Sequence, residues 1–148
     1  MIARSIVSTF VALLLATSVA TPTHAAEMVW SGLVMATNSP EPTPIPAELT
    51  KLEGTLKRLF GYNQFEVIGE KRTSLKTGDE DWLATSKYFS LHVDSKAAKK
   101  ASYSLNLKLF QENNLLLETD AKLTKASPIV VKGPQVGDGQ LVLLLMLE

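Results

Sequence analysis

The chain has 148 residues, 15 basic and 15 acidic residues, and no cysteine. A chain of this length accommodates one ordinary domain with its own hydrophobic core. The balanced charge produces no field that would attract nucleic acid, so nucleic-acid binding is not expected. The lack of cysteine excludes disulfides, and in an exported protein it favours a bacterial envelope location over a small disulfide-rich secreted module.

The first 25 residues have the three-part pattern of a secretory signal peptide. Arg4 supplies a positive charge, an apolar run follows from Ser5 to Ala20, and Pro22 precedes a short segment of small residues. We therefore expect cleavage near Ala25 or Ala26 and a mature protein in the periplasm or outside the cell. The apolar run is shorter than the roughly 20 residues of a transmembrane helix, so no integral membrane span is expected in the mature form. An uncleaved N-terminal anchor is the alternative.

Residues 26–148 are expected to form a single mainly-β domain that begins with a strand, a linker and a helix. An apolar run rich in Val and Met predicts a strand over residues 26–37. Residues 38–46 predict an extended linker, because proline occupies every second position from Pro40 and lacks a backbone donor. Residues 47–60 have apolar side chains at helical spacing, which predicts an amphipathic helix that ends at Gly61. These side chains are Leu49, Leu52, Leu56, Leu59 and Phe60.

After the helix the apolar period changes from 3.6 to 2, which predicts antiparallel strands within residues 62–148. The clearest pair covers residues 103–109 and 115–123. The turn between these runs, Gln111–Asn114, contains asparagines that tolerate the positive φ of a tight turn. Residues 94–100 and the glycine-rich segment 133–139 are predicted to be connecting loops.

The final run, Gln140–Glu148, is apolar at nearly every position. It is therefore either a central strand covered on both faces or a strand at an assembly interface. Together these patterns predict an α+β, mainly-β fold: an antiparallel meander sheet or a small sandwich, with one N-terminal amphipathic helix (residues 47–60) packed on it.

No catalytic site is expected from the sequence. Ser90, His92 and Asp94 alternate along a predicted strand and so share one face. Neighbours two apart along a strand lie roughly 6.5 to 7 Å from each other, which is long for the two hydrogen bonds of a Ser-His-Asp triad. The polar face of an amphipathic strand is the simpler interpretation.

No metal or cofactor is expected either. The densest acidic cluster, Asp79-Glu80-Asp81, lacks the spacing of a calcium loop. One histidine in the mature chain and no cysteine argue against zinc. A phosphate-binding glycine loop is followed by a helix, whereas the glycines from Gly133 to Gly139 precede a predicted strand. A phosphate-binding loop is therefore not expected here.

Three hypotheses for function follow from these observations. The favoured one is an exported bacterial envelope protein that is not an enzyme and acts as a protein-interaction or structural module, through a protein partner or self-association. The alternative is a carbohydrate- or peptide-binding domain that uses Trp82, Tyr88 and His92, because aromatic rings and a histidine are suited to such ligands. The third is a small hydrolase based on His92 and nearby acids.

The signal-peptide prediction is tested by the intact mass of the exported protein. We expect a polypeptide that begins at Ala26 or Glu27, because the small residues before these positions fit signal peptidase. A mass that includes residues 1–25 would contradict cleavage.

Overall fold

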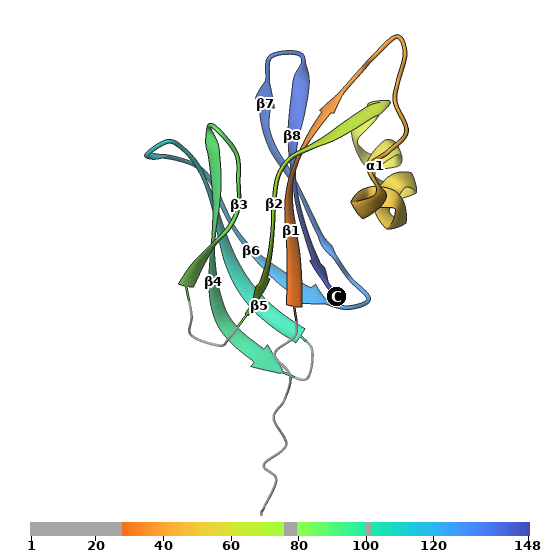
Figure 1. Cartoon of the computed structure of the whole chain (residues 1–148). Helices are drawn as coiled ribbons and strands as arrows, with labels where there is room; N and C mark the ends of the chain where they lie inside the picture. Colours follow the sequence, from red (N-terminus) through yellow and green to blue (C-terminus); the bar gives the residue numbers. More distant parts are fainter. Residues whose placement is uncertain (1–27, 76–79, 100–101) are drawn as a thin grey trace, which may run out of the picture.

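The computed structural model of the protein describes residues 28–75, 80–99 and 102–148. The predicted signal peptide and Asp79 of the predicted acidic turn lie outside these residues. The described chain contains strands and one helical segment (Figure 1). The strands are β1 (Met28–Thr37), β2 (Gln64–Ser74), β3 (Glu80–Thr85), β4 (Phe89–Lys99), β5 (Ser102–Gln111), β6 (Asn114–Thr124), β7 (Ile129–Val136) and β8 (Gly139–Leu147). The helical segment consists of a 3₁₀ helix, η1 (Ala47–Leu52), and an α-helix, α1 (Glu53–Phe60).

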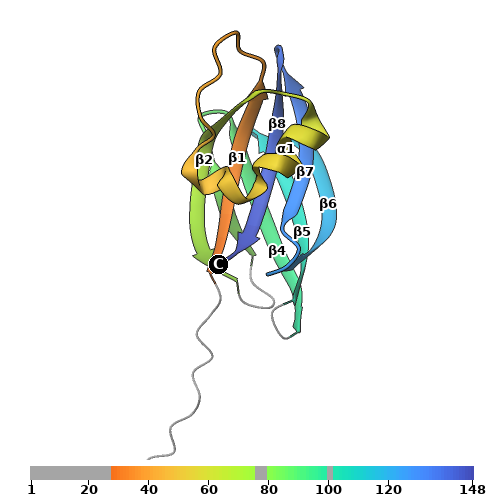
Figure 2. The ribbon, with the colours of Figure 1, turned by 90° about the vertical axis from the view of Figure 1, so that its right-hand side faces the viewer.

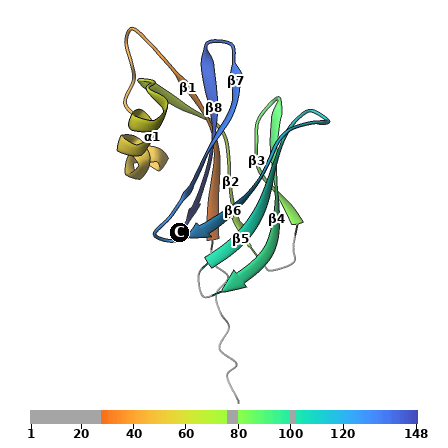
Figure 3. The same cartoon turned by 180° about the vertical axis from the view of Figure 1, so that it is seen from behind.

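The strands form two four-stranded antiparallel sheets. Sheet A has the strand order β2-β1-β8-β7, and sheet B has the order β3-β4-β5-β6. The two sheets face each other, as Figures 1 and 3 show, and buried side chains fill the space between them. The protein is therefore a mainly-β sandwich, which agrees with one of the two predicted architectures.

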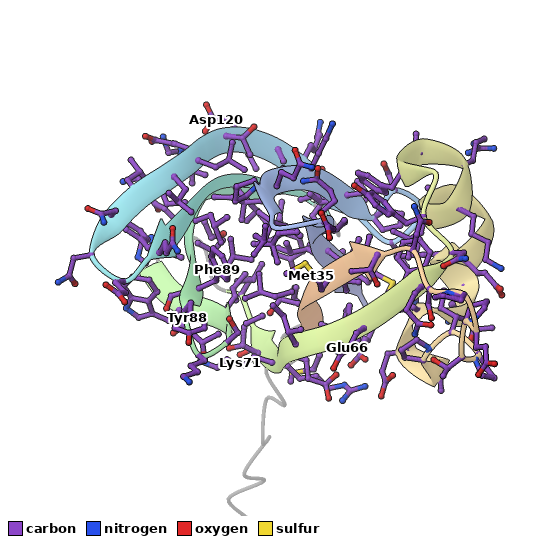
Figure 4. The ribbon with its side chains drawn as sticks, turned by 90° about the horizontal axis from the view of Figure 1, so that it is seen from above. Met35, Glu66, Lys71, Tyr88, Phe89 and Asp120 are labelled. Carbon is purple, nitrogen blue, oxygen red and sulfur yellow. The ribbon has the colours of Figure 1, made fainter. Side chains whose placement is uncertain are left out.

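The core between the sheets consists of alternate residues from every strand. Figure 4 shows Phe89 of β4 and Met35 of β1 lying between the sheets, whereas Asp120 of β6 points away from them. Leu91, Val93 and Leu107 are at most 1 % exposed. The two-residue period that predicted these strands is therefore the alternation between the core and the outside of the sandwich.

Strand β8 lies in the middle of sheet A and is buried on both faces. Its odd-numbered leucines join the core between the sheets, and Val142 and Leu144 join a second core under the helical segment. Figure 2 shows the helical segment lying across the outer face of sheet A. Of the two alternatives for the final apolar run, the structure supports the central strand that is covered on both sides.

The helical segment is in the middle of the chain, not at its N-terminus as predicted. It lies between β1 and β2, and the strand that precedes it, β1, pairs with both β2 and β8 in sheet A. Its first part is a 3₁₀ helix rather than α-helix: Leu49 N–H donates to Pro46 O at 2.9 Å, and no side chain caps this end. The C-terminal cap is as predicted, with Gly61 at φ +64°. No helix in the described part of the chain is both long and apolar enough to cross a membrane.

The apolar face of the helical segment is narrower than predicted. Leu49 and Leu56 are fully buried and Leu52 is 6 % exposed, but Leu59 is 58 % exposed. The single α-helical turn that follows Leu56 carries Leu59 past the edge of the contact with the sheet. Helical spacing therefore identified the correct face but not the point at which the sheet stops covering it.

Three of the predicted loops and turns differ from the structure. Strand β4 continues through the predicted loop 94–100 as far as Lys99, because those residues pair with the first half of β5 after a bulge. Strand β7 includes Gly133 and Pro134, which an edge strand tolerates, and the turn is confined to Gly137 and Asp138. In the β5–β6 turn the positive φ, +55°, belongs to Glu112 rather than to an asparagine.

One long side of the sandwich is joined by hydrogen bonds between the sheets. Ser31 of β1 is fully buried, and its Oγ donates to Lys71 O and accepts the Ala84 N–H at 3.0 Å. Lys71 Nζ donates to Trp82 O at 2.8 Å. These bonds connect β1 and β2 of sheet A with β3 of sheet B, and they fix the position of Trp82 relative to sheet A. We call this side, between β2 and β3, the latched side.

The packing of the helical segment can be tested with two matched substitutions in α1. Leu56→Ala should lower the free energy of unfolding by about 2–5 kcal/mol, because it leaves a cavity above β1 and β8. Leu59→Ala makes the same chemical change on an exposed side chain and should change it by less than about 0.5 kcal/mol. Urea unfolding measures both. Equal losses would mean that the helical segment is not seated on sheet A as described.

Candidate functional site

The two sheets differ in how their outer faces are covered. The outer face of sheet A lies under the helical segment, whereas the outer face of sheet B has no such cover in the described part of the chain (Figures 1 and 2). Six large apolar side chains of the described chain are exposed, and four of them belong to sheet B or to the turn beside it. These four are Trp82, Tyr88, Leu115 and Leu116. Exposed apolar side chains that gather in one place mark a binding surface more often than scattered ones do.

An aromatic cluster of Trp82, His92 and Phe110 forms the centre of this face. Trp82 of β3 lies directly across from His92 of β4, with ring centroids 5.0 Å apart and planes at 68°. The Phe110 ring, from β5, lies 5.6 Å from the Trp82 ring with planes at 59°. Three adjacent strands thus bring their outward-facing rings together, and Trp82 remains 48 % exposed.

Tyr88 lies at the rim of the same face. It belongs to the turn before β4, is 51 % exposed, and has Lys87 Nζ 5.2 Å from its ring centroid. Its carbonyl accepts the N–H of Glu112, which joins this turn to the β5–β6 turn at 3.1 Å. Figure 4 shows Tyr88 beside Phe89, whose side chain enters the core. Of the three predicted site residues, the structure brings Trp82 and His92 into contact and places Tyr88 near them at the sheet end.

Sequence reasoning missed Phe110. It occupies an outward-facing position of β5, two residues after Lys108, and pairs with Ser90 of β4. The alternation of β5 could have identified it, since Leu107 and Leu109 are the core residues of that strand. The bulge beside Phe110 places its extra residue, Leu116, in β6, so the alternation within β5 is undisturbed.

A buried amide with two carboxylates occupies the other half of the face. Asn106 of β5 is only 6 % exposed, and its Nδ2 donates to Glu118 Oε1 at 3.1 Å and to Asp120 Oδ1 at 3.0 Å. Both acids are exposed on β6. No basic side chain of the described chain lies within 4 Å of either carboxylate. Asn106 therefore holds two negative charges together at the edge of sheet B.

The residues considered for catalysis lie on this face as well. Ser90, His92 and Asp94 are half-buried at alternate positions of β4, and the residues between them are buried. The His92 ring contacts the indole of Trp82. In the residues that the structure describes, no group of three or more His, Asp or Glu side chains is placed to hold a metal ion.

A separate cleft of about 450 Å³ lies between η1 and the ends of β1 and β8. Its floor includes Trp30, whose indole N–H donates to Glu70 Oε2 at 2.9 Å. At its rim Arg72 Nε donates to Glu148 Oε1 at 2.9 Å, a hydrogen bond that raises the pKa of the guanidinium above its ordinary value. The rim carries both signs of charge, so it selects no class of charged ligand.

The different environments of the two tryptophans can be tested by fluorescence quenching. Trp82 should be quenched readily by acrylamide, whereas Trp30, which is 1 % exposed, should be protected. Trp82→Phe should therefore remove most of the quenchable emission and shift the remaining spectrum to the blue. If the variant is quenched as strongly as the wild type, the aromatic cluster is not exposed as described.

Comparisons of this chain with protein-family models, with curated proteins and with solved structures found no match.

Proposed function

We propose that the protein is an exported envelope protein that is not an enzyme and binds a protein partner through the outer face of sheet B. The observation that carries this proposal is the unequal covering of the two sheets. The one helical segment covers sheet A, while Trp82, Tyr88, Leu115 and Leu116 remain exposed on or beside sheet B. A fold that buries apolar side chains along most of β8 and leaves these side chains in water is suited to use them in binding.

The aromatic cluster alone gives a modest binding energy. Trp82 and Tyr88 are each about half exposed. Burying the rest of both side chains would remove on the order of 200 Å² from water. At about 25 cal/mol per Å² this stabilises a complex by about 5 kcal/mol. Association itself costs about 4–15 kcal/mol, so a specific partner must also use other parts of the face.

The orientation of the rings favours a protein partner over a flat sugar chain. The Trp82 and Phe110 planes are 59° apart, and Trp82 meets His92 edge-on. These rings present ridges and hollows rather than one flat stacking surface. Irregular apolar surfaces of this kind accept apolar side chains in a packed interface.

A carbohydrate- or peptide-binding function is the second candidate. Trp82, Tyr88 and His92 combine apolar rings with hydrogen-bonding groups, and Tyr88 lies at the open end of the sheet. A titration with soluble oligosaccharides separates this candidate from the first. A saturable change in Trp82 emission, absent in Trp82→Phe, would favour the carbohydrate ligand.

The proposed function is tested by photo-crosslinking in cells that naturally express the protein. A benzoylphenylalanine residue placed at Leu115, which is 50 % exposed beside the cluster, should give a discrete crosslinked product. Adding Trp82→Ala should weaken that product by about tenfold, because a hot-spot aromatic residue is worth at least about 1–2 kcal/mol.

Leu59 provides the matched control for this experiment. It is 58 % exposed but lies on α1, on the other side of the molecule from sheet B (Figure 1). The same photoreactive residue at Leu59 should give no discrete product. Equal products from both positions, or a product from Leu115 that does not depend on Trp82, would contradict binding through the outer face of sheet B.

A further inference from the structure

The side of the sandwich opposite the latched side is open. There β6 of sheet B lies next to β7 of sheet A in the fold. Hydrogen bonds join the ends of these strands only at Thr124 and Ser127. From Leu115 to Leu123 no hydrogen bond connects β6 with β7 in the described chain. The tips of the β5–β6 and β7–β8 hairpins also diverge in Figures 1 and 3.

Of the four edge strands, β6 is the least protected against pairing with another chain. Strand β7 contains Pro134 and a bulge. Strand β3 is short and bulged, and its Trp82 carbonyl accepts a hydrogen bond from Lys71 Nζ. Strand β2 has a bulge and belongs to the latched side. Strand β6 has its bulge near its start and keeps a regular register with β5 from Leu117 to Leu123. An unpaired regular edge is a template for an added strand.

The open side also leaves core side chains partly uncovered. Leu117 and Ala121 of β6 and Val131 and Val136 of β7 are apolar residues that pack against the core but are only partly buried. A strand added to β6 would place every second side chain over Leu117 and Ala121. The inward positions of such a strand therefore require apolar residues.

The outward positions of the added strand face Glu118 and Asp120, with Lys122 next along β6. Glu118 and Asp120 point out of sheet B, are held by Asn106, and have no basic side chain within 4 Å in the described chain. Cross-strand pairs of opposite charge stabilise a sheet, and like charges destabilise it. Lysine or arginine residues opposite Glu118 and Asp120 would complete the pairing.

A second copy of the same edge fits less well. In a symmetric antiparallel pair of β6 strands, a two-fold axis at Glu118 or Asp120 brings that residue against its own copy. An axis at Thr119 brings Glu118 against Asp120 of the other copy. Each of these arrangements opposes two acids directly. An axis at Ala121 instead brings Asp120 against Lys122 of the other copy, but it leaves Glu118 opposite Thr124. A segment that places a basic residue opposite each acid therefore pairs more completely than a second copy does.

We infer that β6 is the docking edge for an extended segment of a partner protein, with apolar residues facing inward and basic residues facing Glu118 and Asp120. This inference rests on the proposed function, because the added strand would extend sheet B, the sheet whose outer face carries the aromatic cluster. It supplies the further contacts that the exposed rings require. The segment binds by strand addition: its backbone hydrogen bonds give affinity and its alternating side chains give specificity.

A synthetic peptide tests this mode of binding. The probe is the seven-residue peptide TVKVRVT, acetylated and amidated at its ends, titrated into ¹⁵N-labelled mature protein. We expect amide shift changes concentrated in β6, from Leu117 to Leu123. The peptide TVKPRVT, in which proline removes a central backbone donor, should lose this binding on the wild-type protein. Shift changes centred on another strand, or equal binding of the proline peptide, would overturn the inference.

Charge reversal provides the second arm of the test. The double variant Glu118→Lys/Asp120→Lys should bind TVKVRVT about tenfold more weakly and should bind TVEVEVT instead, whereas Glu66→Lys on β2 should change neither by more than about twofold. A fold check by circular dichroism accompanies each variant. If the double variant is folded and keeps its preference for TVKVRVT, the acidic pair does not select the segment, and the inference fails.

The two proposals can fail separately. Trp82→Ala should leave the peptide shifts in β6 in place, since Trp82 belongs to the opposite edge strand of sheet B. If the peptide does not bind but crosslinking at Leu115 still depends on Trp82, strand addition at β6 is wrong and binding through the outer face stands. If the peptide binds β6 and crosslinking fails, the outer-face proposal is wrong, and a protein-binding edge remains.

Discussion

The structure depends on the need to cover β8 on both faces. This strand is apolar at nearly every position, and it has β1 on one side and β7 on the other. Sheet B covers one face, and only the helical segment is available to cover the other. Trp30 of β1 fills the same second core, and its ring lies over Gly32, where an added Cβ would collide with the indole. In the described residues one helical segment provides this cover, and it lies on sheet A, so the outer face of sheet B stays uncovered there.

Much of the fold could be predicted because local periodicity reports burial. The alternation in β4, β5 and β6 identified the strands, and the spacing of Leu49, Leu52 and Leu56 identified the buried face of the helical segment. The helical segment has the predicted residues, but the description of it as N-terminal was wrong, because β1 precedes it. The choice between one sheet and two could not be made from the sequence, because pairing between the first and last strands is a long-range property. No local pattern distinguishes a strand covered by a helix from one covered by another protein.

The candidate site was predictable to a similar extent. The sequence predicted Trp82 because it is aromatic and follows the acidic cluster, and it predicted His92 because it lies on the polar face of a strand. The β3–β4 register makes these two residues neighbours. Phe110 was not selected, because its contact with Trp82 depends on the pairing of β3, β4 and β5. The role of Asn106 could not be inferred, because its burial arises from the carboxylates of Glu118 and Asp120 on the adjacent strand. The open side between β6 and β7 likewise depends on how the sheets diverge.

The two long sides of the sandwich differ: the sheets are joined by hydrogen bonds on the latched side and lack them along most of the open side. Buried Ser31 and the side chain of Lys71 connect the sheets on the latched side. On the other side, β6 keeps a regular register with β5, but most of its length has no hydrogen-bonded strand on its outer edge. Its acids and the neighbouring apolar positions define the kind of segment that fits, while the aromatic cluster adds a second contact area on the same sheet.

Amide hydrogen exchange measured by NMR on the mature protein tests this account most directly. Strand β8 has a partner on each side, so its amides should exchange most slowly and at a rate set by global unfolding. In β6, every second amide between Leu117 and Leu123 should exchange much faster, because an edge strand directs alternate N–H groups away from its only partner. Uniformly slow exchange in β6, equal to that in β8, would mean that this edge is already covered and would contradict the account.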